Sequence, residues 1–127
     1  IIFRIAKITP IKTGQFVTIW KRDTPEQEIS PFDVKDNFDL IIICVFDESN
    51  KGIFLFDKNI LLKKDLISSN EKGGKRGFRV YPPWCSPESK QALQTQKWQS
   101  EYFISFATEN LNDIQSSVNR FLTTINH

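Results

Sequence analysis

The sequence predicts one α+β domain with a mixed central β-sheet flanked by helices. Runs of Ile, Val, Phe and Trp with strand periodicity occupy most of the first 60 residues, and helical spacing with capping residues is prominent in the second half. A chain of 127 residues suffices for one hydrophobic core, and its content of 39% hydrophobic and 25% charged residues is typical of a soluble globular protein. We therefore expect residues 1–127 to form a single domain.

The first two strands are expected to form a hairpin. Residues 1–8 alternate apolar and polar side chains, which predicts a half-buried strand. Thr, Val, Ile and Trp are frequent in residues 16–22, which predicts a second strand, and Gly14 falls in the turn between them. This hairpin would place Lys7 and Lys12 near its turn. Because the chain begins with Ile inside an apparent strand, we also expect an additional N-terminal segment upstream.

A buried strand is expected at the centre of the sheet. Residues 23–37 are polar, acidic and interrupted by two prolines, so they predict a long loop. The continuous apolar run of residues 40–46 predicts a central strand buried on both faces. After a polar hairpin loop at residues 47–52, residues 53–56 predict the returning strand.

The second half of the chain predicts helices around two further strands. The spacing of Leu and Ile predicts a short helix over residues 58–67, and residues 77–81 predict a strand that follows a loop. Residues 101–106 favour a final strand over a continued helix. An apolar stripe with 3- and 4-residue spacing predicts a last helix over residues 110–127.

The helix between these two strands is unusually polar. Ser86-Pro87-Glu88 predicts its start, because a hydroxyl cap, a first-turn proline and an early acid all favour a helix N-terminus. Only Ala92 and Leu93 are small or aliphatic core candidates. The remaining side chains include Gln91, Gln94 and Gln96, and we interpret this polar face as a binding surface.

The net charge of +2 conceals an uneven distribution. Residues 1–22 carry five basic side chains and no acid, residues 57–79 carry seven basic against three acidic side chains, and residues 23–50 carry eight acidic side chains against one Lys. If the two basic segments meet in space, they form a positive face that attracts phosphates through counterion release. The alternative is that these charges only solvate the surface.

Basic, aromatic and amide side chains gather around the predicted strand 77–81 and the polar helix. Lys and Arg can contact phosphates, Tyr and Trp can stack on unpaired bases, and Gln can hydrogen-bond to sugars, phosphates or base edges. We interpret Trp98 as a core residue; Tyr81 and Trp84 fit either role, and Arg79 can instead pair with an internal acid. The candidate nucleic-acid-binding residues are Lys7, Lys12, Lys75, Arg76, Arg79, Tyr81, Trp84, Lys90, Gln94 and Lys97.

Catalytic and metal-binding motifs find little support, and we predict no metal and no cofactor. The single histidine, His127, ends the chain. Asp33-Val34-Lys35 and Glu88-Ser89-Lys90 match the D/E-x-K triplet of restriction-type nucleases, whose carboxylates hold Mg²⁺. The first lies in a predicted loop and the second starts a helix, so we interpret both as structural. Cys44 and Cys85 lack CxxC spacing and are expected to be free thiols in a reducing cytoplasm.

Three blocks of the sequence resemble the MepB-like proteins of bacteria. The first is FRIAKITPIKTGQFVTIWKR, residues 3–22, and the second is KRGFRVYPPW, residues 75–84. The third combines SKQA, residues 89–92, with TQKWQ, residues 95–99. The resemblance covers most of the chain up to about residue 106 and does not extend to the predicted last helix.

This resemblance implies a restriction-endonuclease-like core that lacks the catalytic carboxylates and lysine. It also implies nucleic-acid binding, an upstream segment and an association with drug response, because members of the family are often encoded beside multidrug efflux components. The resemblance transfers no catalytic residue to this chain.

The sequence thus predicts a cytoplasmic, non-catalytic nucleic-acid-binding protein, with single-stranded DNA or RNA as its favoured partner and no membrane contact. No stretch approaches the roughly 20 apolar residues of a membrane span. One alternative is an atypical Mg²⁺-dependent nuclease whose activity depends on Asp39. The other is a protein-interaction module in a drug-response circuit that uses residues 23–50 or the last helix.

Overall fold

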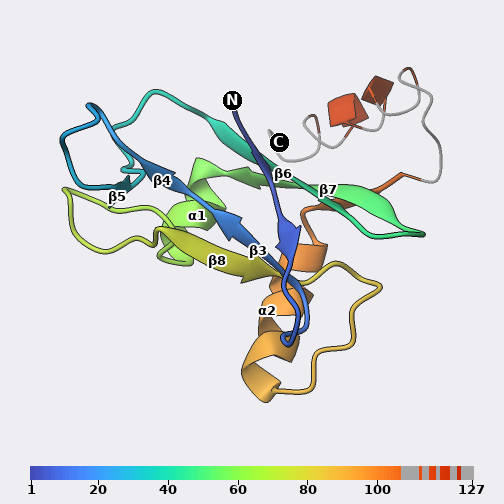
Figure 1. Ribbon diagram of the computed structural model, residues 1–127. Coiled ribbons are helices and arrows are strands. Elements are labelled where there is room, and N and C mark those ends of the chain that lie inside the picture. Colours follow the sequence, from blue (N-terminus) through green and yellow to red (C-terminus); the bar gives the residue numbers. More distant parts are fainter. Residues whose placement is uncertain (107–111, 113–114, 117, 121–122, 124–127) are drawn as a thin grey trace.

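A four-stranded sheet forms the centre of the protein (Figure 1). In sheet order, its strands are β1 (Ile2–Ile5), β6 (Leu40–Phe46), β7 (Lys51–Asp57) and β9 (Phe103–Ser105). The computed structural model describes residues 1–106, 112, 115, 116, 118–120 and 123. β1 runs parallel to β6, whereas the other neighbours pair antiparallel. The prediction of an α+β protein with a mixed sheet is therefore confirmed, as is a strand within residues 101–106.

The strand β6 has the bounds that its apolar run predicts, and most of its side chains are buried. The hairpin that follows is tighter than predicted, because β7 begins at Lys51 rather than at residue 53. The Asp47 carboxylate accepts hydrogen bonds from the backbone N–H groups of Ser49 and Asn50, at 2.9 and 2.8 Å, and closes the turn early.

A second sheet is antiparallel and consists, in order, of β2 (Lys7–Ile8), β3 (Gln15–Thr18) and β8 (Gly77–Val80). β2 and β3 form the predicted hairpin. The predicted first strand, residues 1–8, is however divided at Ala6, so that its first half joins the central sheet. Ala6 is buried and donates its N–H to the carbonyl of Cys44 at 3.0 Å. The apolar positions change at this point from Phe3 and Ile5 to Ala6 and Ile8, so the alternation shifts by one residue where the strand divides. The prediction of one continuous strand did not take this shift into account.

The predicted second strand, residues 16–22, is also divided. After β3, the strand β4 (Trp20–Lys21) pairs antiparallel with β5 (Ser30–Pro31), which lies inside the predicted acidic loop. Ile19 is buried between β3 and β4 and donates its N–H to the carbonyl of Arg76 at 2.9 Å. The pairing with β8 therefore continues one residue beyond β3.

The main hydrophobic core lies between the two sheets and is closed by the two helices. Phe54 and Phe56 on β7 are fully buried, and their rings stack with centroids 5.4 Å apart. The ring of Trp98 lies 5.4 Å from that of Phe56, which confirms the interpretation of Trp98 as a core residue. Full burial of one such ring stabilises the fold by about 1.5–3 kcal/mol.

The opposite face of the central sheet is apolar and partly open. On the edge strand β1, Phe3 and Ile5 remain 63% and 64% exposed. A second buried cluster on this face consists of Leu40, Ile42, Ile53 and Leu55, and Val118 packs against it. The predicted last helix, residues 110–127, falls mostly outside the described residues.

The first helix, α1 (Lys58–Lys63), begins at a capping side chain and is shorter than predicted. The Asp57 carboxylate accepts a hydrogen bond from the N–H of Ile60 at 2.9 Å. Asp65 adopts a φ of +57°, in the left-handed region, which stops the helix before the predicted end at residue 67.

The second helix, α2 (Lys90–Ser100), starts three residues later than predicted. Ser89 rather than Ser86 is the N-cap, because the Ser89 hydroxyl accepts the hydrogen bond from the N–H of Ala92 at 3.1 Å. Leu93 is 48% exposed, so its prediction as a core candidate is wrong.

Candidate functional site

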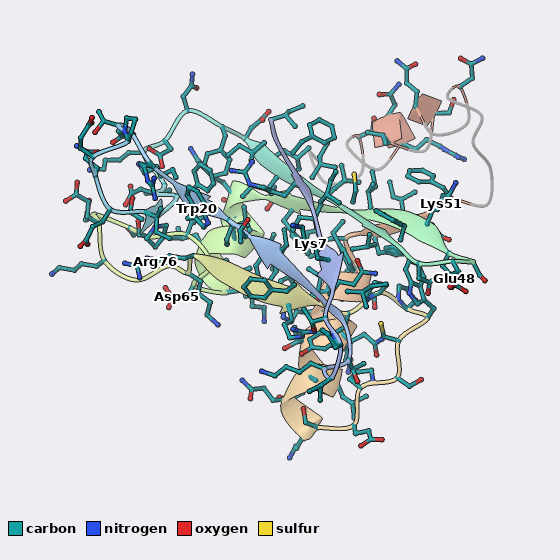
Figure 2. The ribbon with its side chains drawn as sticks, in the orientation of Figure 1. Lys7, Trp20, Glu48, Lys51, Asp65 and Arg76 are labelled. Atoms are coloured by element: carbon teal, nitrogen blue, oxygen red, sulfur yellow. The ribbon has the colours of Figure 1, made fainter. Side chains whose placement is uncertain are left out.

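The outer face of the three-stranded sheet brings together side chains from three separate segments. The register places Lys7 of β2 opposite Phe16 of β3, and Phe16 opposite Arg79 of β8. Residues directly opposite one another in a sheet project from the same face. Lys7 and Arg79 therefore flank the exposed ring of Phe16. Figure 2 labels Lys7 on β2 and Arg76 where the chain enters β8.

The Arg79 guanidinium holds the β2–β3 hairpin closed. Its Nε donates to the carbonyl of Thr13 at 3.0 Å, and its Nη2 donates to the hydroxyl of Thr9 at 2.6 Å. Nη2 also donates to the carbonyls of Lys12 and Gly14, both at 3.3 Å. These partners are hairpin oxygens rather than the internal acid considered from sequence. Arg79 is thus a positioning residue, and a contact with phosphate remains a prediction for it.

Two glutamines occupy the inward face of α2, where most surface helices place aliphatic side chains. Gln96 donates from Nε2 to two carbonyls of the proline-rich loop, at 3.0 and 2.9 Å, so its amide is engaged inside the protein. Gln99 is fully buried; its Nε2 donates to the carbonyl of Arg79 at 3.1 Å, and its Oε1 accepts from the N–H of Tyr81 at 2.8 Å. The polar character of α2 therefore attaches the helix to β8.

A groove of about 330 Å³ lies between α2, the edge of β8 and the end of α1. Its walls combine basic side chains, amides, hydroxyls and aromatic rings. Trp98 and Tyr81 line it, and both are half-buried. The close fit of the Tyr81 ring against the hairpin requires Gly14, whose φ is +83° and where a Cβ would lie 2.8 Å from that ring.

Three hollows share lining residues with this groove, and the four together are called the basic groove below. One hollow of about 250 Å³ reaches the β2–β3 hairpin, one of about 480 Å³ follows α2, and one of about 540 Å³ enters the loop before β8. The two basic segments of the sequence therefore meet here. The predicted residues that line the basic groove are Lys12, Lys75, Arg76, Arg79, Tyr81, Gln94 and Lys97.

Three predicted residues lie outside the basic groove. Lys7 projects beside Phe16 on the outer face of the sheet, and Lys90 is exposed at the start of α2. Trp84 packs edge-on against Phe103, with ring centroids 5.7 Å apart. This packing favours the alternative interpretation of Trp84 as a core residue.

Lys64 is a groove residue that sequence reasoning missed. Its Nζ lies 5.3 Å from the centre of the Trp98 ring, within the range of a cation–π interaction. In the sequence it belongs to the polar face of a predicted helix, and only the packing of α1 beside α2 brings it to the groove. Gln99 was also missed, although its spacing of seven residues from Ala92 is that of a helix face.

Ion pairs do not neutralise the basic groove. Six basic side chains line it, against the two acids Glu88 and Glu101. Between described residues, the structure contains two ion pairs, and neither involves these six side chains. The groove therefore carries an excess of positive charge. Its basic side chains are Lys12, Lys64, Lys75, Arg76, Arg79 and Lys97.

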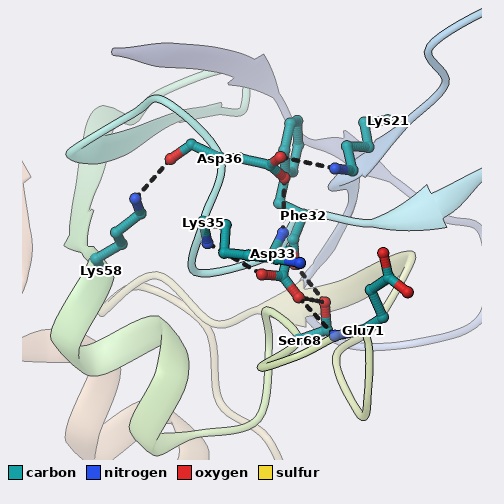
Figure 3. Close-up of polar contacts among 8 residues, drawn as sticks. All are labelled: Lys21, Phe32, Asp33, Lys35, Asp36, Lys58, Ser68 and Glu71. Carbon is teal, nitrogen blue, oxygen red and sulfur yellow. Dashed lines mark hydrogen bonds and ion pairs between the residues drawn. The ribbon is translucent and has the colours of Figure 1, made fainter.

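In the acidic segment, the buried carboxylate of Asp33 joins two loops (Figure 3). It accepts hydrogen bonds from the N–H of Lys35 at 3.0 Å, the hydroxyl of Ser68 at 2.7 Å and the N–H of Glu71 at 2.9 Å. These donors stabilise the charged form and lower the pKa of Asp33 to about 2.

Asp36 links the same region to β4 and to α1 (Figure 3). Its carboxylate pairs with the Lys21 ammonium at 2.7 Å and accepts from the N–H of Asp33 at 2.7 Å. Its carbonyl accepts from Lys58 Nζ at 2.6 Å. Burial raises the pKa of Asp36, but the bonds from Lys21 and Asp33 outweigh it and leave the pKa below its ordinary value.

Both D/E-x-K triplets have structural roles. Asp33 binds loop donors, and Ser89 of the second triplet caps α2. Among the described residues, no three His, Cys, Asp or Glu side chains lie together as a metal-binding group. Cys44 and Cys85 are free thiols, as predicted, and burial raises the pKa of both. None of the helices in the described part of the chain has the length and apolar character needed to cross a bilayer.

The fold and the site define an α+β protein with a mixed four-stranded sheet and a basic groove between an edge strand and a polar helix. The sequence matches the MepB-like family over residues 1–105, and the chain belongs to this family. The crystal structure of MepB is 41% identical to it, with a TM-score of 0.77 over 84% of this chain and 71% of that chain. Among curated proteins, none matches the sequence. The resemblance seen in three sequence blocks is thereby confirmed.

Proposed function

We propose that this protein binds single-stranded DNA or RNA along the basic groove, without catalysis. The observation that carries the proposal is the meeting of basic side chains from residues 1–22, residues 57–79 and α2 around one groove, with no ion-pair partner among the described residues. Such a surface gains affinity for phosphates by releasing condensed counterions.

Single strands are favoured because charge and aromatic rings occur together in the groove. Proteins that bind single strands combine a positive track for the backbone with aromatic surfaces for the bases. Here Lys64 and Lys75 supply charge next to the rings of Tyr81 and Trp98. Amide groups of α2, including Gln91 and Gln94, add donors and acceptors along the same track.

The proposal extends to four finer features. A restriction-endonuclease-like core without its catalytic carboxylates and lysine, a bacterial origin and a link to drug response rest on family membership. A cytoplasmic location rests on the two free thiols.

A binding panel tests the proposal and both alternatives. Labelled single- and double-stranded DNA and RNA of one sequence are mixed with the protein, with Mg²⁺ or with chelator. We expect single strands to bind best and to stay intact, with log affinity falling by about 0.7 per phosphate contact for each tenfold rise in salt.

Affinity that is independent of salt would overturn the basic-groove proposal. Cleavage that requires Mg²⁺ and is lost in Asp39→Ala would establish the nuclease alternative. Capture of a purified protein partner, without retention of any oligonucleotide, would establish the interaction module.

A further inference from the structure

The strand β8 has one edge that no other strand covers. The N–H of Ile19 donates to the carbonyl of Arg76, so backbone groups of Arg76 and of every second residue after it face β3. Those of Gly77, Arg79 and Tyr81 therefore point away from β3, towards α2 and the groove. β8 is the last strand of its sheet, so this edge has no strand partner.

Gln99 bonds to part of this edge in the way that the backbone of a neighbouring strand would. Its carboxamide bonds to the carbonyl of Arg79 and the N–H of Tyr81, at 3.1 and 2.8 Å. One carboxamide thus satisfies the carbonyl of one residue and the N–H of the residue two positions later.

The same pair of groups recurs one step along β8, as the carbonyl of Gly77 and the N–H of Arg79. This pair is called the open rung below. None of the hydrogen bonds between described residues involves either group. Phe78 and Arg79 line the groove of about 330 Å³, and Gly77 lines the adjoining hollow before β8. The open rung therefore faces solvent inside the proposed binding track.

We propose that the open rung binds the Watson–Crick edge of an unpaired nucleobase. This inference rests on the proposed function and names the group recognised within the same groove. A carboxamide presents a donor beside an acceptor, which is why Asn and Gln pair bidentately with N6 and N7 of adenine. The Watson–Crick edge of an unpaired base likewise offers a donor beside an acceptor. The Gln99 carboxamide binds one carbonyl and one N–H on the edge of β8. The open rung offers a base the same two kinds of group, two residues earlier along the strand.

The surroundings favour a base over a peptide strand. Strand addition relies on several consecutive main-chain bonds, whereas the open rung provides one donor and one acceptor. Gln99 closes it on one side, and on the other side the chain turns away at Lys75, whose N–H donates to the carbonyl of Leu66 at 3.2 Å. Lys64 and Lys75 stand beside the rung as charges for the flanking phosphates.

A base bound in this way cannot be paired in a duplex, because its Watson–Crick edge is in use. The open rung therefore provides a physical reason for selecting single strands. Since every base offers a donor beside an acceptor on that edge, we expect recognition that tolerates sequence.

The test compares oligothymidylate with the same oligonucleotide built from N3-methylthymine. The methyl group removes the base donor and leaves the phosphates unchanged. We expect about tenfold weaker binding of the methylated strand, the cost of an unmatched polar group, with the same salt dependence. Equal, salt-dependent binding of both strands would overturn this inference and leave the proposed function standing. Binding of neither strand would overturn both.

A protein variant locates the effect in the groove. Thr95 lines the groove beside Trp98 and Gln99, so Thr95→Phe narrows it from the α2 wall. We expect this variant to lose the tenfold preference for unmethylated strands. Leu93→Phe is the matched control, since Leu93 lies exposed on the same helix and lines none of the hollows of the basic groove. Loss of the preference in Leu93→Phe as well would contradict the assignment.

A labelled glutamine-rich peptide completes the comparison. Saturable binding of this peptide, with no binding of oligothymidylate, would identify a polypeptide carboxamide as the occupant of the open rung and overturn the base assignment.

Discussion

At the residue scale, the type of a side chain predicts the kind of interaction it makes better than it predicts which residues it contacts. An internal acid was one predicted partner of Arg79, but its guanidinium binds four oxygen atoms of a hairpin more than 60 positions earlier in the chain. No local pattern encodes such a contact, because it exists only once β8 has paired with β3. The predicted contact with phosphate stays a prediction. Trp98 was predicted correctly, since a large aromatic ring on a helix gains most free energy from core burial.

Arg79→Lys separates shape from charge at this position. The ammonium cannot reproduce bonds from both Nε and Nη2, so we expect a loss of about 1–2 kcal/mol in the free energy of unfolding, measured with denaturant. The salt dependence of oligonucleotide binding should not change, because the positive charge is kept. Arg76→Lys, at an exposed position, is the control and should change stability by less than about 0.5 kcal/mol.

Asp33→Asn tests the pKa of the buried carboxylate. The folded pKa of about 2 lies below the unfolded value, so the ionised form stabilises the fold above about pH 4, and this contribution is lost as the pH falls towards 2. We therefore expect the variant to melt below the wild type at neutral pH and the difference to shrink as the pH is lowered from 4 to 2. A melting-temperature difference that stays constant over this range would contradict the assignment. The exposed Asp23→Asn is the control.

At the scale of elements, the continuous apolar run of β6 predicted its bounds, whereas the bounds of most other elements differ from the prediction. β6 matches its prediction because burial on both faces demands a continuous apolar run. The start of α2 was misplaced, since both Ser86 and Ser89 can cap a helix and only the folded chain shows which hydroxyl reaches an N–H. The polar inward face of α2 was unexpected for a similar reason. Gln99 bonds to backbone groups on the uncovered edge of β8, and the sequence does not show that β8 ends its sheet.

Gln99→Leu removes these hydrogen bonds while keeping the side-chain volume similar. The carbonyl of Arg79 and the N–H of Tyr81 lose their partners, and each unpaired buried group costs about 1–3 kcal/mol. Because both hydrogen bonds are only partly buried, we expect a total loss in the lower part of the summed range, about 2–4 kcal/mol in the free energy of unfolding. The exposed Gln94→Leu should stay within about 0.5 kcal/mol of the wild type; a similar loss in both variants would mean that the bonds of Gln99 contribute little.

At the scale of the whole molecule, the sequence indicated the class of fold and the charge imbalance but not the path of the chain. Residues 1–8 divide between two sheets, and a local pattern does not show which strands the two halves will join. The groove forms where α1, α2 and β8 meet, so the prediction that the two basic segments converge was a hypothesis about tertiary structure. The lining of the groove by Lys12 from one segment and Lys75 from the other supports that hypothesis.

The most direct measurement is the salt dependence of single-strand binding in two matched double variants. Lys75→Ala with Lys97→Ala removes two charges from the basic groove, and Lys35→Ala with Lys63→Ala removes two exposed charges elsewhere. We predict that the slope of log affinity against log salt falls in magnitude by about 1.4 in the groove variant and stays unchanged in the other. Equal slopes in the two variants, or slopes near zero in the wild type, would contradict the account.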